Sequence, residues 1–145
     1  MADVDERVER LAELLEAERA GVFAARFLVE NSVDENERRF MEQILDGEKE
    51  SCRLIGRSLV REAGSTTGNV GQFYLKVMAL DDPVERLNLL IKGQEWVVRK
   101  LDEILSDWAE PEILGSLDRI RKVHVENIEA CKQFLSTRQS GAGDQ

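Results

Sequence analysis

Several polar side chains interrupt the apolar stripes of this sequence and are its candidates for chemistry. Glu18 lies midway along one stripe, and Glu48 and Ser51, three residues apart, lie on the next. The other members of these two stripes are apolar: Leu11, Leu15, Val22, Ala25, Met41, Ile44 and Ile55. Because an unpaired charge inside a protein core is costly, inward-facing carboxylates need a metal ion, a cationic side chain or hydrogen-bond donors beside them.

The second half of the chain contributes a histidine, an arginine and an ambiguous pair of neighbours. His124, the only histidine, shares its face with apolar residues, and Arg121 lies one turn before it. On the preceding segment the stripe selects either Glu95 or Gln94, so one of the two faces inward. The two alternative sets of apolar residues are, respectively, Val84, Ile91, Val98 and Leu105, or Leu87, Leu90 and Leu101.

Four long amphipathic helices must position these side chains. Apolar residues recur at three- and four-residue steps, which predicts helices from about Asp5 to Glu30, from about Asp34 to Glu62, from Pro83 to about Asp107 and from Ile113 to near Thr137. A short helix within Val70 to Leu80 is expected to lie on the surface of the bundle. The sequence therefore predicts an all-α protein.

The connections between the helices indicate their directions. The first and last links are tight turns, so the helices that they join pair antiparallel. About twenty residues separate the second and third helices, whereas ~11 extended residues suffice to cross a bundle ~35 Å long. The middle link can therefore run the length of the bundle, which makes the second and third helices parallel. The alternative is a middle segment that folds back on itself.

This pattern resembles the ferritin-like family of carboxylate-bridged di-iron proteins. That family places one Glu on the first helix, Glu-x-x-His on the second, one Glu on the third and Glu-x-x-His on the fourth. The resemblance implies a ferritin-like four-helix bundle with a long crossover, and it is carried by the stretches ELLEAERAG and HVENIEAC. It implies four ligand places, filled in order by Glu18, Glu48, Glu95 (or Gln94) and His124.

Two positions depart from the family pattern. Ser51 stands where the second helix would offer its His, and Arg121 where the fourth would offer its Glu. With Arg121 included, the charges of the cluster sum to about −2, which suits one divalent ion better than two. An Arg guanidinium can donate hydrogen bonds to two carboxylates, so we expect Arg121 to point inward and hold Glu18 and Glu48 together.

Three interpretations place these residues in the core: a metal-free polar core, a site for one iron or manganese ion, or a di-metal centre. In a fourth, the stripe assignment is wrong by one position and the glutamates are solvated. The first predicts a non-catalytic binding or structural module without a cofactor, with a homodimer as the candidate assembly. The competing hypothesis is an iron- or manganese-dependent oxidase or peroxidase of the ferritin-like type.

The composition bounds the remaining classes. A length of 145 residues suits one domain, which we place at residues 1–138, with a disordered tail at 139–145. A net charge of −9 argues against nucleic acid and membrane partners. The acidic start MADVDER precedes no apolar signal segment, and we expect a cytoplasmic protein. Cys52 and Cys131 fit apolar stripes and are expected to be reduced and buried.

Overall fold

Helices make up nearly all of the computed structural model, which describes residues 4–64, 68–107 and 111–143. They are α1 (Val4–Glu30), α2 (Glu35–Ala63), the short α3 (Phe73–Met78), α4 (Pro83–Asp107) and α5 (Pro111–Gly143). No strand occurs within these described ranges. The four predicted long helices and the short one are confirmed.

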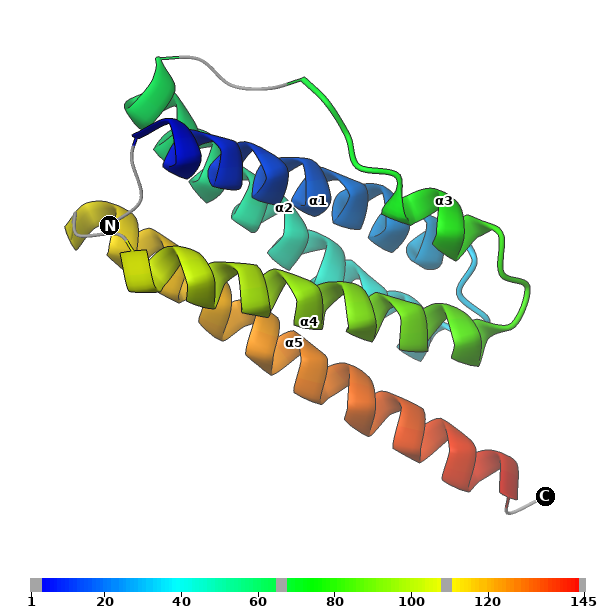
Figure 1. Cartoon of the computed structure of the whole chain (residues 1–145). Coiled ribbons are helices and arrows are strands. Elements are labelled where there is room, and N and C mark those ends of the chain that lie inside the picture. The colour runs from blue at the N-terminus through cyan, green and yellow to red at the C-terminus, as the bar shows by residue number, and fades with distance from the viewer. Residues whose placement is uncertain (1–3, 65–67, 108–110, 144–145) are drawn as a thin grey trace.

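Two antiparallel helix pairs and one long crossover define the topology. In Figure 1, α2 and α4 run in the same direction, and the segment between them returns along the outside of the bundle through α3. Each of α1 and α5 packs against both α2 and α4, while α3 contacts α1 and α4. The predicted crossover is therefore confirmed, and a middle segment that folds back on itself is excluded.

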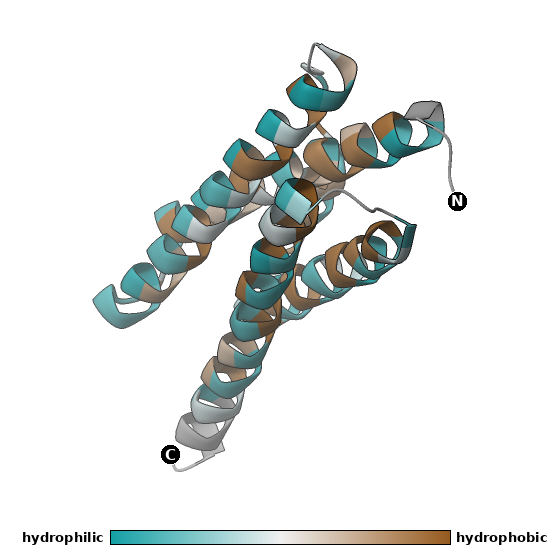
Figure 2. Cartoon of the chain, turned by 90° about the vertical axis from the view of Figure 1, so that its left-hand side faces the viewer, coloured by the Kyte–Doolittle hydropathy of each residue, from teal (hydrophilic) through white to brown (hydrophobic). Residues whose placement is uncertain are grey.

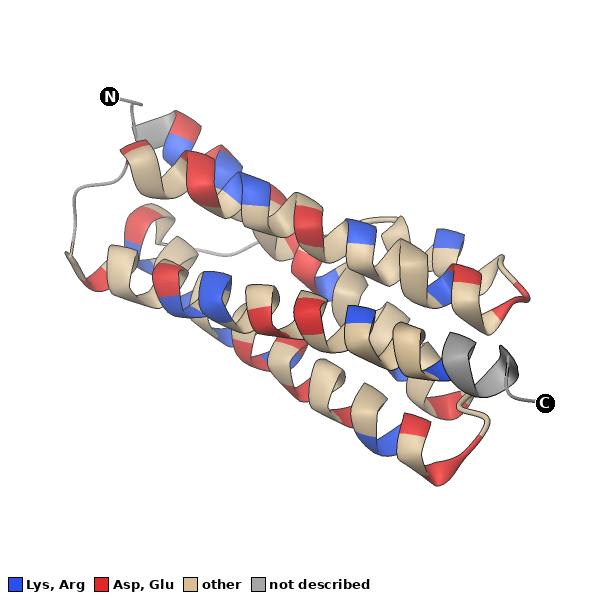
Figure 3. Cartoon of the chain, turned by 90° about the horizontal axis from the view of Figure 1, so that it is seen from below, with Lys and Arg blue, Asp and Glu red and all other residues tan. Residues whose placement is uncertain are grey.

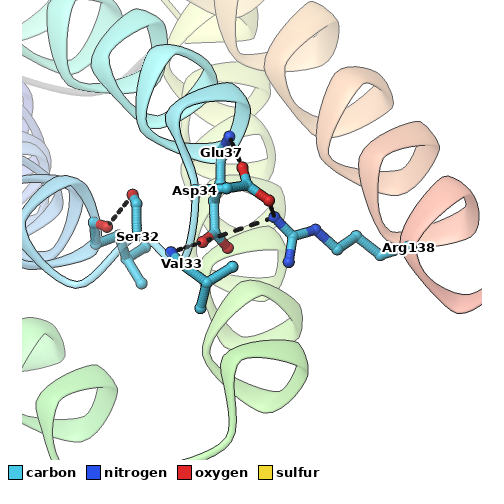
Figure 4. Close-up of polar contacts among 6 residues, drawn as sticks. Ser32, Val33, Asp34, Glu37 and Arg138 are labelled. Carbon is cyan, nitrogen blue, oxygen red and sulfur yellow. Dashed lines mark hydrogen bonds and ion pairs between the residues drawn. The ribbon is translucent and has the colours of Figure 1, made fainter. Parts of the chain in front are cut away.

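The tight turn between α1 and α2 is held by reciprocal capping, shown in Figure 4. The Asp34 carboxylate accepts from the backbone N–H of Glu37 at 2.8 Å, and the Glu37 carboxylate accepts from the N–H of Val33 at 2.6 Å. Arg138 of α5 lies 2.9 Å from Asp34 and 3.8 Å from Glu37. Because these contacts satisfy free amides at the start of α2, they fix where that helix begins.

The end of the chain differs from the sequence-based boundary. We predicted a disordered tail from residue 139, whereas the backbone of α5 stays helical through Gly143. The helix thus continues past Gly141, although glycine is a poor helix former. The last two residues of the predicted tail lie outside the described ranges.

The apolar core consists of two clusters, one toward each end of the bundle. Hydrophobic and hydrophilic residues alternate along the helices, as Figure 2 shows, which is the pattern of amphipathic helices. One cluster joins the first half of α1 to the second half of α2, and the other joins the second half of α1 to the first half of α2. Between them lie buried polar residues from all four long helices, here called the polar layer: Glu18, Glu48, Ser51, Gln94 and His124.

The crossover is attached to the bundle through two glycines. The backbone N–H of Gly71 donates to the carbonyl of Glu16 at 2.9 Å, and a Cβ on Gly71 would lie only 3.2 Å from that oxygen. Gly93 of α4 faces the ring of Phe73, where a Cβ would lie 2.7 Å from Cζ. These close approaches bring residues 71–73 over the groove between α1 and α4.

The charged residues cover the outside of the helices with both signs interspersed, as Figure 3 shows for one face. Within the described residues, no helix is both long enough and apolar enough to cross a lipid bilayer.

Candidate functional site

The polar layer brings three ionisable side chains together from three helices. Glu18 of α1, Glu48 of α2 and His124 of α5 are each at most 2% exposed, and one donor atom from each lies within 4.8 Å of the other two. The Nε2 of His124 is 3.0 Å from Glu18 Oε1 and 3.6 Å from Glu48 Oε1. We call these three residues the buried centre.

The imidazole of His124 is oriented by its own helix. Its Nδ1 lies 2.9 Å from the carbonyl oxygen of Ile120, one turn earlier in α5, and donates to it. This hydrogen bond directs Nε2 toward the two carboxylates. Histidines that bind metals commonly hold one ring N–H on a backbone carbonyl in this way, which leaves the other nitrogen to coordinate the metal.

The carboxylate of Glu48 fits into space left by a glycine of α1. A Cβ on Gly21 would overlap Glu48 Oε2 and lie 3.0 Å from Glu48 Cδ. With no side chain at this position, Glu48 reaches across from α2 to Glu18. Glycine is a poor helix former, so its presence inside α1 is accounted for by this contact.

The electrostatics of the buried centre favour two bound protons. Burial and the neighbouring Glu18 charge raise the pKa of Glu48 well above its usual range, and the nearby imidazole only partly offsets this. Burial alone would lower the pKa of His124, but the charges of Glu18 and Glu48 raise it to about 10. A protonated Glu48 and an ion pair between Glu18 and His124 make the metal-free centre neutral.

The third ligand place of the family pattern is occupied by Gln94. Gln94 is 3% exposed, and within the described residues neither its Nε2 nor its Oε1 has a hydrogen-bond partner. Glu95 is partly exposed and is not part of the buried centre. The reason is that α4 buries the stripe of Leu87, Leu90 and Leu101, and leaves Val84, Val98 and Leu105 only partly covered.

Ser51 lies one turn beyond Glu48 and is 2% exposed. It is thus at the depth predicted for it. A hydroxyl at this position provides no imidazole nitrogen, so α2 offers the buried centre a single strong ligand, Glu48.

The prediction that Arg121 points into the bundle is wrong. Its side chain is 37% exposed, and its Nε donates to Asp102 of α4 at 2.5 Å. Position 121 lies at the edge of the inner stripe, between the buried Ile120 and His124. A long guanidinium there reaches water and a surface carboxylate, which avoids the cost of burying its charge.

A cavity of about 440 Å³ adjoins the buried centre, a feature that the sequence did not reveal. Its walls come from α1, from residues 71–73 of the crossover and from α4, and Glu18, Glu48 and Gln94 contribute to its lining.

The two cysteines have raised thiol pKa values. Burial, and then the charges of Glu18 and Glu48, raise the pKa of Cys52 to about 12. Burial, and then the charge of Glu48, raise the pKa of Cys131 to about 12. Such thiols are unreactive at neutral pH.

Comparison with solved structures shows the same fold. The chain aligns with ferritin-like, diiron-carboxylate proteins from Bacillus anthracis strain Ames with a TM-score of 0.82 at 15% identity, covering 93% of this chain and 99% of that one. It also aligns with the crystal structure of a two-domain protein from Anabaena variabilis that contains DJ-1/ThiJ/PfpI-like and ferritin-like domains. That alignment has a TM-score of 0.75 at 12% identity and covers 96% of this chain but 38% of the two-domain protein.

The ferritin-like resemblance is thereby confirmed for the fold. At these identities the likeness does not extend to the site residues, so the chemistry has to be argued from the chain itself. No protein of curated function matches the sequence. A family profile described as "Domain of unknown function (DUF6306)" matches residues 5–133.

Proposed function

This chain belongs to the family described as a domain of unknown function (DUF6306), and we propose that its ferritin-like bundle binds one divalent transition-metal ion in the buried centre. The observation that carries the proposal is the convergence of Glu18, Glu48 and His124 within 4.8 Å inside the core. Three strong ligands from three helices at this depth are otherwise expensive to bury together.

The donor set fits one such ion. Two carboxylates balance the charge of a divalent cation, and a neutral imidazole adds a nitrogen ligand whose orientation is already fixed by Ile120. Both oxygens of Glu18 lie 3.0 Å from His124 Nε2, so an ion that displaces the imidazole proton would meet a carboxylate and the ring nitrogen together. Mixed oxygen and nitrogen ligands suit Fe²⁺ and Mn²⁺, and Zn²⁺ would compete.

The residues present do not fit two ions. Gln94 brings a neutral amide where a second ion would need a charged carboxylate, and Ser51 brings no imidazole. Arg121 is on the surface and contributes no ligand. A bound iron or manganese ion would supply Lewis acidity or one-electron redox chemistry, and the cavity walled by α1, the crossover and α4 adjoins the residues that would hold it.

The competing interpretation is a metal-free polar core, in which two protons neutralise the buried centre. It accounts for the Glu18–His124 contact at 3.0 Å but leaves the Gln94 amide without a partner within the described residues. A metal-dependent oxidase or peroxidase is a second candidate, favoured by the adjoining cavity because an enzyme needs a path to its metal. A homodimer stays a prediction that a mass measurement in solution would check.

Metal content tests the proposal directly. We expect elemental analysis of protein purified without chelators, and a manganese titration followed by electron paramagnetic resonance, to give one ion per chain. Glu48→Gln should retain the fold, because a Gln mimics the protonated Glu48, and should weaken Mn²⁺ binding roughly 10-fold or more.

The matched control is Glu50→Gln on the same helix, since Glu50 pairs with Arg53 at the surface and should bind Mn²⁺ like the parent. A titration that ends at zero or at two ions per chain contradicts the proposal. So does a Glu48→Gln variant with unchanged affinity.

A further inference from the structure

The cavity beside the buried centre is built as a binding site for an organic molecule. Its volume of about 440 Å³ lies within the roughly 300–1,000 Å³ range of small-molecule pockets. Most of its lining is apolar and includes Phe73 of the crossover and Leu90, Trp96 and Val97 of α4. A molecule that enters it must therefore have a mainly apolar body.

One residue of the lining has unmet hydrogen-bonding capacity. Gln94 is 3% exposed, yet both its amide nitrogen and its amide oxygen have no partner within the described residues. Leaving a buried amide unpaired costs roughly 1–3 kcal/mol per group. The same cavity is lined by Glu18, whose carboxylate pairs with His124 but keeps further lone pairs that can accept a hydrogen bond. Among the buried polar lining, Gln94 thus offers both a donor and an acceptor, and Glu18 offers acceptor oxygens.

The polar groups of Gln94 and Glu18 limit which polar group a bound molecule can carry. An ammonium group has no acceptor for the Gln94 N–H, and an alcohol has a single O–H to donate to the oxygens of Gln94 and Glu18. A carboxylate has no N–H for the Gln94 carbonyl, and it would bring a second negative charge next to Glu18. A primary carboxamide has two N–H donors and one carbonyl, so it matches Gln94 in a paired arrangement and has a donor left for Glu18.

We propose that this cavity binds a small apolar molecule that carries an uncharged primary carboxamide, recognised by Gln94. The crossover forms the outer wall through Gly71, Gln72 and Phe73, so the site is present only when this segment is docked. The proposal does not depend on a metal, because Gln94 is not part of the buried centre.

The test uses the full chain, treated with a chelator, and benzamide as the probe in calorimetry and ligand-observed NMR. N,N-dimethylbenzamide has the same ring and carbonyl but no N–H, and benzoate adds a charge. We expect benzamide to bind roughly tenfold or more tightly than either. Gln94→Leu should reduce the affinity for benzamide to that for the dimethyl compound, while the neighbouring Glu95→Gln should leave it unchanged.

A second variant tests the proposal in case Gln94→Leu does not fold. Ala17→Leu on α1 fills the cavity from its wall, and it should abolish benzamide binding with helicity unchanged. Equal binding of benzamide and its dimethyl derivative, benzamide binding that survives Gln94→Leu, or no binding at all would overturn the proposal. Because the protein is metal-free, none of these results depends on whether the buried centre binds an ion. The same measurement after adding Mn²⁺ shows whether the two sites coexist.

Discussion

Gly21 determines where the carboxylate of Glu48 can lie, although it contributes no side chain of its own. In the structure that carboxylate occupies the volume that a Cβ of residue 21 would need. The far end of a glutamate is flexible, so an added methyl group would move the carboxylate and leave the helices in place. The positions of the ligand atoms in the buried centre thus depend on Gly21, a residue that offers no ligand itself.

We therefore predict that Gly21→Ala weakens Mn²⁺ binding roughly 10- to 100-fold while the protein stays folded, because such supporting contacts typically contribute that much to metal affinity. Gly115→Ala on α5 is the control, since nothing lies within 4 Å of a Cβ there. Titrations of both variants, with circular dichroism as a check on folding, measure the difference. Parent-like affinity in Gly21→Ala would show that Glu48 is not a ligand.

Among the elements, the crossover is the one whose attachment is least regular. It contacts the bundle through α3, through the Gly71–Glu16 hydrogen bond and through the Phe73 ring against Gly93. Residues 71–73 thereby form one wall of the cavity. Helix packing alone does not place such a segment, because it has no long apolar stripe of its own.

A pair of Gly→Ala variants measures this attachment. In the middle of a helix Ala is favoured over Gly by about 0.5–1 kcal/mol. Gly56→Ala on α2 should gain this stability, because a Cβ there meets nothing within 4 Å. Gly93→Ala should not gain it, because the new Cβ would lie 2.7 Å from Phe73 Cζ and displace the ring.

Urea unfolding of the two variants and the parent provides the comparison. If Gly93→Ala is stabilised as much as Gly56→Ala, the packing of Phe73 on α4 does not hold the crossover.

For the whole molecule, the polar layer couples stability to pH because it lies between the two apolar clusters. A group whose pKa is higher in the folded than in the unfolded protein stabilises the fold only while the unfolded chain also holds the proton. The pKa of His124 is about 10 in the folded protein, against roughly 6.5 in an unfolded chain. Its contribution is thus complete below pH ~6.5 and is lost as the pH rises toward 10. The raised pKa of Glu48 acts in the same direction.

We predict that the metal-free protein melts at progressively lower temperature between about pH 6.5 and 8.5, with a loss of at most about 1.4 kcal/mol per pH unit for each proton involved. Free thiols of an unfolded chain ionise near pH ~8.5, so Cys52 and Cys131, whose pKa values are raised in the fold, add to the loss only at the upper end of this range. His124→Gln should have a flatter profile because it removes the main titrating group. A melting temperature that is constant or rises over this range in the parent would show that His124 is not protonated in the fold.

The sequence by itself determined the helices and their connection. Apolar residues at three- and four-residue steps are a local signal, and the length of the middle link decides whether it can span the bundle. The same periodicity placed Glu18, Glu48 and His124 on inner stripes, and all three are buried. Their role as metal ligands is a proposal that the Mn²⁺ titration tests.

Only the tertiary structure decided which residues at the edges of these stripes face inward. An inner stripe is roughly 100° wide, so Gln94 and Glu95 both fit until the packing of α4 on α1 and α5 buries one of them. Arg121 turned outward because Asp102 on the adjacent helix offers it a solvated partner, a contact that depends on how α4 and α5 align. The cavity depends on where the crossover docks, and the contacts of Gly71 and Gly93 that set this have no period along the chain.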